Sequence, residues 1–286
     1  EKVGIDQAKL PPLRSPLEVL GTVTAGASAA TGIPAGTPVL VGACDVNAEA
    51  FACGAFDPGS LLLVYGSTLS TLYTVGEFKS LPGFLTGPSI LPGTYRLGGA
   101  TSSGGRYLDW LKRLLGDEAP ADISGLDGPT DILMMPFLDG ARLPHQNPSW
   151  QVSWQGMSSS TDKRTLWKAA YEAMGCELAD LLDRFTQVGP LPSFGYLTGG
   201  LASNRQFLQV VADVSGLTLL HFKQVNAAYG DALMALSSKK GMDQVREILL
   251  RRREGNMETI VPDKGLFKAY TQKRRHYKAF CHFLTV

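Results

Sequence analysis

Short apolar runs separated by glycine turns dominate the first half of the chain. Residues 37–42 form a β-rich run, and residues 61–65 form a fully apolar run that predicts a central strand covered on both faces. The chain breaks at residues 66–70, and residues 71–75 predict the next strand. This region is therefore expected to fold as strand, turn and strand.

Helical spacing of apolar residues becomes prominent further along. Leucines recur at helical spacing from Leu108 to Leu115, behind a serine that is a favourable helix N-cap. The strongest helical pattern begins near Asp162 and runs to Phe185, with Glu177 as the polar residue on its apolar face. Further strands are predicted at residues 95–98, 132–135, 194–197 and 217–222, and further helices at residues 207–211, 227–235 and 267–284. Strands that alternate with helices predict an α/β layer architecture.

The composition is that of a globular chain that can bury a core. Of the 286 residues, 44% are hydrophobic and 19% are charged, which excludes extensive disorder and a collagen-like fibre. No apolar run approaches the roughly 18 residues of a membrane span. The 27 Lys and Arg residues nearly balance the 26 Asp and Glu residues, so no protein-wide field attracts other polyions. We expect a soluble protein with neither nucleic-acid nor membrane partners.

Local charge is less even. The segment from Arg246 to Lys278 contains ten Lys or Arg residues against four Asp or Glu residues. The favoured interpretation is a solvated helix face near the C-terminus, and a contact with phosphate or another polyanion is the alternative. Isolated charged residues such as Glu49 are expected on the surface.

Cysteine and histidine are scattered rather than grouped. The cysteines are Cys44, Cys53, Cys176 and Cys281, and the histidines are His145, His221, His276 and His282. The absence of any Cys-x-x-Cys pair argues against a disulfide framework and fits a reducing, cytoplasmic location. The absence of a His-Glu-x-x-His helix argues further against a metal centre built by the protein.

Three glycine turns have the features of anion sites, because each follows a strand and contains small residues. Gly66-Ser67-Thr68 offers a tight turn with two hydroxyl groups. The pair at residues 104–105 precedes a helix, and the pair at residues 199–200 is followed by Asn204 at the next helix start. Neither a P-loop nor a Gly-x-Gly-x-x-Gly helix start occurs, so those two nucleotide-binding folds are excluded.

Asp45 is the candidate for acid–base chemistry. It stands at the end of an apolar strand, where a carboxylate is placed to accept a proton from a hydroxyl group that attacks phosphorus. The same position also suits a residue that caps the following helix. Both interpretations of Asp45 remain open from the sequence.

These motifs occur in an order that resembles a known family. In chain order they are Gly-x-x-Asp at residues 42–45, Gly-Ser-Thr-x-Ser at 66–70, Ser-Gly-Gly-x-x-x-x-Trp at 103–110, Pro-Phe-Leu-x-Gly-x-Arg-x-Pro-His-x-x-Pro at 136–148, and Gly-Gly-x-x-x-Asn at 199–204. Residues 154–172 resemble a further signature of that family. From about Leu20 to Tyr277 the chain is thus similar to the FGGY carbohydrate kinases.

The resemblance implies an α/β fold of the actin-like ATPase (ribonuclease H-like) type, with two domains around a cleft. Residues 1–56 are expected to be the C-terminal end of the N-terminal, sugar-binding domain, and residues 57–286 the C-terminal, nucleotide-binding domain. Asp45 matches the family's catalytic base. The nucleotide-side positions are Gly66, Ser67 and Thr68 at the ATP phosphates, Gly105 as a second phosphate-side glycine, and Gly199, Gly200 and Asn204 beside the adenosine. Mg²⁺ is expected to arrive with ATP.

The chain also departs from the family pattern. Val46 stands where members often place a polar residue that touches the sugar, and Ala141 replaces an acidic residue. Thr165 occupies a position where a larger polar side chain is usual. Most of the sugar-binding domain is not represented, and further residues are expected before Glu1. These departures affect the choice of sugar and leave the glycine turns intact.

The function implied by the resemblance is ATP-dependent phosphorylation of a small sugar or polyol, with a ketopentose such as xylulose as the favoured substrate. The alternative is a catalytically silent or split relative that needs a missing domain or a partner chain, and a homodimer is a further possibility. An actin-like ATPase that hydrolyses ATP is disfavoured, because Asp45 and residues 136–148 fit sugar kinases better.

Overall fold

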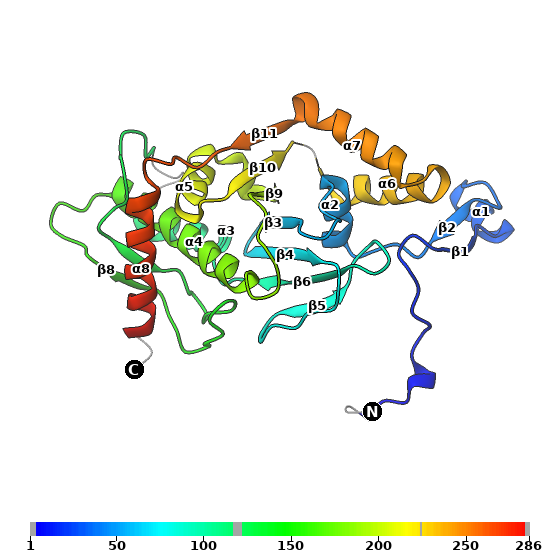
Figure 1. Cartoon of the computed structure of the whole chain (residues 1–286), viewed down its shortest axis with the longest axis horizontal. Helices are drawn as coiled ribbons and strands as arrows, with labels where there is room; N and C mark the ends of the chain where they lie inside the picture. The colour runs from blue at the N-terminus through cyan, green and yellow to red at the C-terminus, as the bar shows by residue number, and fades with distance from the viewer. Residues whose placement is uncertain (1–3, 117–121, 224, 284–286) are drawn as a thin grey trace.

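The computed structural model describes residues 4–116, 122–223 and 225–283. In this part of the chain seven strands form one mixed sheet at the centre of the fold (Figure 1). From edge to edge they are β11 (Met257–Ile260), β10 (Thr218–Phe222), β9 (Phe194–Thr198), β3 (Leu61–Tyr65), β4 (Leu69–Val75), β6 (Tyr95–Ala100) and β5 (Leu85–Pro88). Strands β10, β9 and β3 run parallel, and the remaining neighbours pair antiparallel.

Strand β3 lies in the middle of the sheet, as its apolar sequence predicts. Its neighbours are β9 and β4. Leu61 and Leu63 belong to the hydrophobic core on one face of the sheet, whereas Leu62 belongs to a core on the other face. Both faces of the strand are covered, which explains why its sequence shows no alternation of polar and apolar residues.

Helices cover the two faces of the sheet (Figure 1). The larger core, which includes Leu61 and Leu63, is completed by α3 (Gly105–Leu115), α4 (Lys163–Phe185), α5 (Arg205–Ser215) and α8 (Phe267–Phe283). On the opposite face α2 (Asp45–Cys53) packs beside Leu62, and α6 (Ala227–Lys240) and α7 (Met242–Asn256) pack against α2. The predicted α/β layer architecture is confirmed.

Helices α2 and α6 approach each other at backbone distance. A Cβ atom built on Gly230 of α6 would lie 1.9 Å from the carbonyl oxygen of Ala48 in α2. Ala48 is itself fully buried, and Phe51 on the next turn packs in the same core as Leu233 and Met234 of α6. Glycine at position 230 is therefore what lets α6 hold α2 against the sheet.

Helix α4 begins where its pattern predicts and is more deeply buried than its pattern suggests. The Asp162 carboxylate accepts a hydrogen bond of 2.8 Å from the Thr165 amide, so Asp162 is the N-cap. Glu177 is fully buried on the apolar face, as expected. Lys168 and Glu172 are buried as well, because Lys168 donates to carbonyls of the 126–128 loop and Glu172 contacts Lys273 and Tyr270 of α8. Spacing along α4 alone did not reveal these contacts.

One local prediction is wrong. The N-cap of α3 is Gly104 and not a serine, because Ser102 instead donates a hydrogen bond to the Gly140 carbonyl and accepts one from the Arg142 amide. The strand predicted at residues 132–135 is confirmed as β7 (Leu133–Met135), and it pairs with β8 (Ser153–Gln155) in a separate sheet. Of the last helix, Phe267 is half exposed, and Leu284 lies outside the described residues.

A small lobe precedes α2. It comprises η1 (Gln7–Lys9), β1 (Val19–Thr22), α1 (Ala25–Thr31) and β2 (Pro38–Leu40), and β1 pairs antiparallel with β2. Helix α1 buries none of its residues. Along the described stretches of the chain, no helix combines the length and apolar character needed to cross a membrane.

The basic C-terminal segment is only partly a solvated face. Arg246 pairs with Asp57 at 2.6 Å, and Arg274 and Lys278 both pair with Asp183. Lys273 is buried. Several of these cations thus bind the protein itself, which leaves fewer of them for a polyanion than the sequence count suggests.

Candidate active site

The structure brings the three glycine turns together at one end of the sheet. The amide of Gly105 at the start of α3 donates to the carbonyl of Gly66 at 2.8 Å, so the first two turns are hydrogen-bonded. A Cβ atom on Gly104 would lie 2.5 Å from the Ser67 carbonyl oxygen, and one on Gly199 would lie 2.4 Å from the Tyr65 carbonyl oxygen. Backbone therefore packs directly on backbone around the 66–68 turn, and the side-chain-free positions are a requirement of this packing.

The backbone amides of this cluster differ in whether they already form a hydrogen bond within the protein. Gly66 donates to Thr68, and Leu69 donates to Ser103, whereas the amides of Ser67 and Thr68 form no hydrogen bond with any described residue. At the anion site expected for residues 104–105, the Gly105 amide is not available to a ligand, because its N–H donates to Gly66 inside the protein. The 66–68 turn therefore offers free donors to an anion, and Gly105 allows the close approach of α3 to that turn.

The third turn likewise contains one residue that is open to a ligand and one whose side chain is held by hydrogen bonds. Gly199 has a φ of 102° in the left-handed half of backbone space, which favours glycine. The amide of Gly200, the next residue, forms no hydrogen bond with the described chain, and a Cβ atom there would meet nothing within 4 Å. Asn204 caps α5 by accepting from the Phe207 amide at 3.0 Å and also donates to the Tyr171 hydroxyl. Space at this turn lies at Gly200, while the Asn204 side chain is held by the fold.

Asp45 is the first residue of α2 and is exposed. Its Oδ1 accepts a hydrogen bond of 2.7 Å from the Val46 amide, and Oδ2 has no hydrogen-bond partner among the described residues. The N-cap position belongs to Cys44, so Asp45 is not the cap residue. An acidic side chain in the first turn is nevertheless stabilised by the helix dipole. One carboxylate oxygen is thus held and the other is free.

Glu49 links α2 to the glycine turns. The Thr198 hydroxyl donates to Glu49 Oε2 at 3.2 Å, and Thr198 is the residue immediately before Gly199. Glu49 lies one helical turn after Asp45. The expectation that Glu49 is a free surface residue is wrong, since it fixes the helix that carries Asp45 to the strand that carries the third turn.

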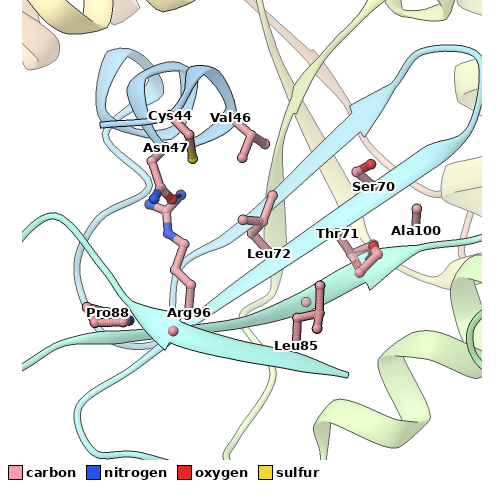
Figure 2. A pocket seen from close by; sticks show the side chains of 13 residues that line it. Cys44, Val46, Asn47, Ser70, Thr71, Leu72, Leu85, Pro88, Arg96 and Ala100 are labelled. Carbon is pink, nitrogen blue, oxygen red and sulfur yellow. Dashed lines mark hydrogen bonds between the residues drawn. The ribbon is translucent and has the colours of Figure 1, made fainter. Parts of the chain in front are cut away.

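A cavity of about 410 Å³ opens beside the start of α2, against strands β4, β6 and β5 (Figure 2). Its lining residues are Cys44, Val46, Asn47, Ser70, Thr71, Leu72, Leu85, Gly87, Pro88, Arg96, Gly98, Gly99 and Ala100. Asp45 does not line it, although both of its neighbours in the chain do. Val46 gives the wall an apolar side chain at the position singled out in the sequence.

Sequence reasoning missed Arg96. It lies on β6, is 5% exposed, and is one of the residues that line the cavity. Burial lowers the pKa of Arg96 to about 10, which leaves it charged at neutral pH. The available signal was a charged residue at the second position of a strand whose other residues are uncharged.

The described residues contain no group of three or more His, Cys, Asp and Glu side chains that is placed to hold a metal ion. Mg²⁺ usually keeps several waters and binds substrate phosphates, so it does not require such a cage. The donors that the site offers are amide and hydroxyl groups, which match phosphate oxygens rather than a cation.

Comparisons with known proteins agree on one family. The sequence model for the C-terminal domain of the FGGY family of carbohydrate kinases matches residues 61–238. The chain is 27% identical to xylulose kinase of Escherichia coli over 289 residues, which cover 96% of this chain and 58% of that protein. It is also 27% identical to L-xylulose/3-keto-L-gulonate kinase of Escherichia coli, covering 94% of this chain and 55% of that protein.

Among solved structures, xylulose kinase from Rhodospirillum rubrum superimposes with a TM-score of 0.86 at 27% identity. The match covers 98% of this chain and 58% of that structure. The chain therefore shares the fold of these kinases and spans somewhat more than half the length of the relatives it matches.

Proposed function

Because the chain belongs to the FGGY family of carbohydrate kinases, we propose that it carries the nucleotide side of an enzyme that phosphorylates a sugar or polyol with ATP. The observation that supports this most directly is the assembly of the 66–68 turn, α3 and the 199–200 turn into one surface. That surface presents free backbone amides, which suit phosphate oxygens. Asp45 lies on a helix fixed to the same surface through Glu49.

The free amides and hydroxyl groups of Ser67 and Thr68 are proposed to bind the phosphates of ATP. Fixed donors of this kind stabilise charge that moves onto phosphate oxygens during transfer. The open space at Gly200 is proposed to lie beside the adenosine. Mg²⁺ would be held mainly by the phosphates themselves and would neutralise part of their charge.

Asp45 is proposed as the general base. The sugar hydroxyl oxygen attacks the γ-phosphorus, its proton moves to the free Oδ2 of Asp45, and the bond from the γ-phosphorus to the bridging oxygen breaks to release ADP. The hydrogen bond from the Val46 amide orients the carboxylate by holding its other oxygen. Positioning and charge neutralisation then supply most of the rate enhancement.

The names of the relatives support a proposal for the substrate class. Both Escherichia coli relatives are named for xylulose, and one is also named for a keto sugar acid. We therefore propose a ketopentose or a keto acid of similar size. The apolar Val46 in the cavity wall supports a contact with the carbon face of such a substrate rather than with its hydroxyl groups.

The test is a coupled assay of ADP release with a panel of sugars, sugar acids and polyols, on the complete translation product of the gene. Asp45→Asn should lower kcat by on the order of 10²–10⁴ and leave ATP binding in place. Asp243→Asn is the matched control, because Asp243 is another exposed acid in the first turn of a helix. ATP binding without turnover of any panel compound would favour the catalytically silent alternative.

A further inference from the structure

Arg96 is a buried cation without an anionic partner. Its Nη1 donates to Asn47 Oδ1 at 3.0 Å, and its Nη2 donates to the carbonyl of Ala55 at 2.8 Å. Both acceptors are neutral, and no carboxylate of the described residues forms an ion pair with Arg96. Burying a charge without a counter-charge is costly, and buried arginines are normally paired. This arrangement therefore calls for an anion from outside the described chain.

Hydrogen-bonding capacity at Arg96 is also left over. A guanidinium group has five N–H donors, and the two hydrogen bonds above use two of them. The Nε atom is buried and has no partner. Figure 2 shows the guanidinium group beside Asn47 and close to Cys44 at the start of α2. The unused donors belong to a residue that lines the cavity next to Asp45.

The register between strands β4 and β6 shows which residues lie at the two ends of the cavity. Ser70 pairs with Ala100, Leu72 pairs with Gly98, and Thr74 pairs with Arg96. Ser70 lies two residues after the 66–68 turn. The Ser70–Ala100 pair is therefore the end of the cavity near that turn, and Arg96 lies further along β6. Four residues of strand span roughly 13 Å, part of which the long arginine side chain bridges. Gly98, Gly99 and Ala100 line the cavity between the two ends, and we place a short extended molecule along them.

From these contacts we propose that the cavity binds the carboxylate end of a sugar acid, an aldonate or ketoaldonate, through Arg96, while a hydroxyl group near its other end is phosphorylated. This inference rests on the proposed function and narrows its substrate class. Guanidinium and carboxylate match in shape and charge and form paired hydrogen bonds. A neutral sugar would leave the Arg96 charge uncompensated in the complex.

The test compares compounds that differ only in carboxylate against hydroxymethyl: gluconate with glucitol, xylonate with xylitol, and galactonate with galactitol. On the complete translation product, kcat/KM should favour the acid of a pair by on the order of 10- to 100-fold. Arg96→Gln should collapse that ratio towards one. If glucitol and xylitol are phosphorylated and no acid is preferred, the sugar-acid proposal is overturned while the kinase proposal stands.

A second variant covers the risk that Arg96→Gln misfolds. Asn47→Asp places a carboxylate 3.0 Å from Arg96 Nη1 with almost no change in shape, so it should supply the missing counter-charge and also collapse the ratio. Asn147→Asp is the matched control, since Asn147 accepts hydrogen bonds from Ser149 outside this cavity and its Asp variant should keep the ratio. An unchanged ratio in Asn47→Asp would show that Arg96 has a structural role only.

A binding measurement separates the two proposals if no compound is turned over. Gluconate, without ATP, should raise the melting temperature of the chain more than glucitol does, and Asn47→Asp should abolish that difference. Such a shift without turnover would support the anion site and count against the proposed kinase activity. An equal shift with inorganic phosphate would instead assign the cavity to anions in general and overturn the carboxylate assignment.

Discussion

The ammonium nitrogen of Lys273 in α8 lies 2.5 Å from Oε2 of Glu172 in α4, and both side chains are buried. Lys273 also donates to the carbonyls of Thr130 and Ile132 at 2.6 and 2.8 Å. This ion pair joins the last helix to the longest helix and to the segment that leads into β7. The basic C-terminal segment thus holds the layers together at this point.

Lys273→Met should lower the free energy of unfolding by about 3–5 kcal/mol, because it leaves the Glu172 carboxylate buried without a cation. Urea denaturation followed by circular dichroism measures this loss. Lys268→Met on the exposed side of the same helix is the control and should change stability little. Adding Glu172→Gln to Lys273→Met should recover part of the loss, and a failure to recover any would locate the cost elsewhere.

Neighbouring glycines in the third turn should respond differently to alanine. Gly199→Ala introduces a Cβ atom 2.4 Å from the Tyr65 carbonyl oxygen at a φ of 102°, so it should cost about 1–3 kcal/mol of stability from backbone strain, with the contact in addition. Gly200→Ala meets nothing within 4 Å and should keep the fold, yet it should weaken ATP binding if adenosine lies there.

Chemical denaturation measures the stability of the Gly199→Ala variant, and calorimetric titration with ATP and Mg²⁺ measures ATP binding by the Gly200→Ala variant. The proposed adenosine-side role of Gly200 is contradicted if Gly200→Ala binds ATP as tightly as the parent chain does.

Glu177 should make the fold less stable as pH rises. Burial raises the pKa of this carboxyl well above its ordinary value, so the folded chain binds the proton more tightly than the unfolded chain. Stability therefore falls as pH rises above the unfolded pKa of the group. Glu177→Gln should raise the free energy of unfolding by roughly 1–3 kcal/mol at pH 7.5 and by almost nothing near pH 4.

Urea denaturation across that pH range checks the slope for Glu177. The exposed Glu254→Gln variant serves as the control and should show no such trend. A gain for Glu177→Gln that is equal at both pH values would point to packing rather than proton binding.

How much of this fold is visible in the sequence depends on whether the cause is local. The apolar run of β3 and the Asp162 cap of α4 act within a few residues, so pattern and propensity predict them. The order of the glycine motifs also identifies the turns that later meet. Their meeting itself depends on backbone contacts between distant segments, which spacing along the chain does not encode.

The missed features all involve partners far away in sequence. Glu49 is bonded to a residue 149 positions later, and Arg96 reaches back 49 positions to Asn47. Ser102 looks like a helix cap but is occupied by a loop 38 residues downstream. In each case a polar side chain that could have a local role instead forms a hydrogen bond with a residue distant in the sequence. Only the three-dimensional structure shows which residue that is.

The close approach of Gly230 to Ala48 makes the position of Asp45 depend on a residue of another helix. Any side chain there would push against the backbone of α2, and with it the helix turn that carries Asp45. The close contact therefore restricts which residues evolution can place at position 230, whereas the exposed Asp231 beside it can be replaced without this restriction.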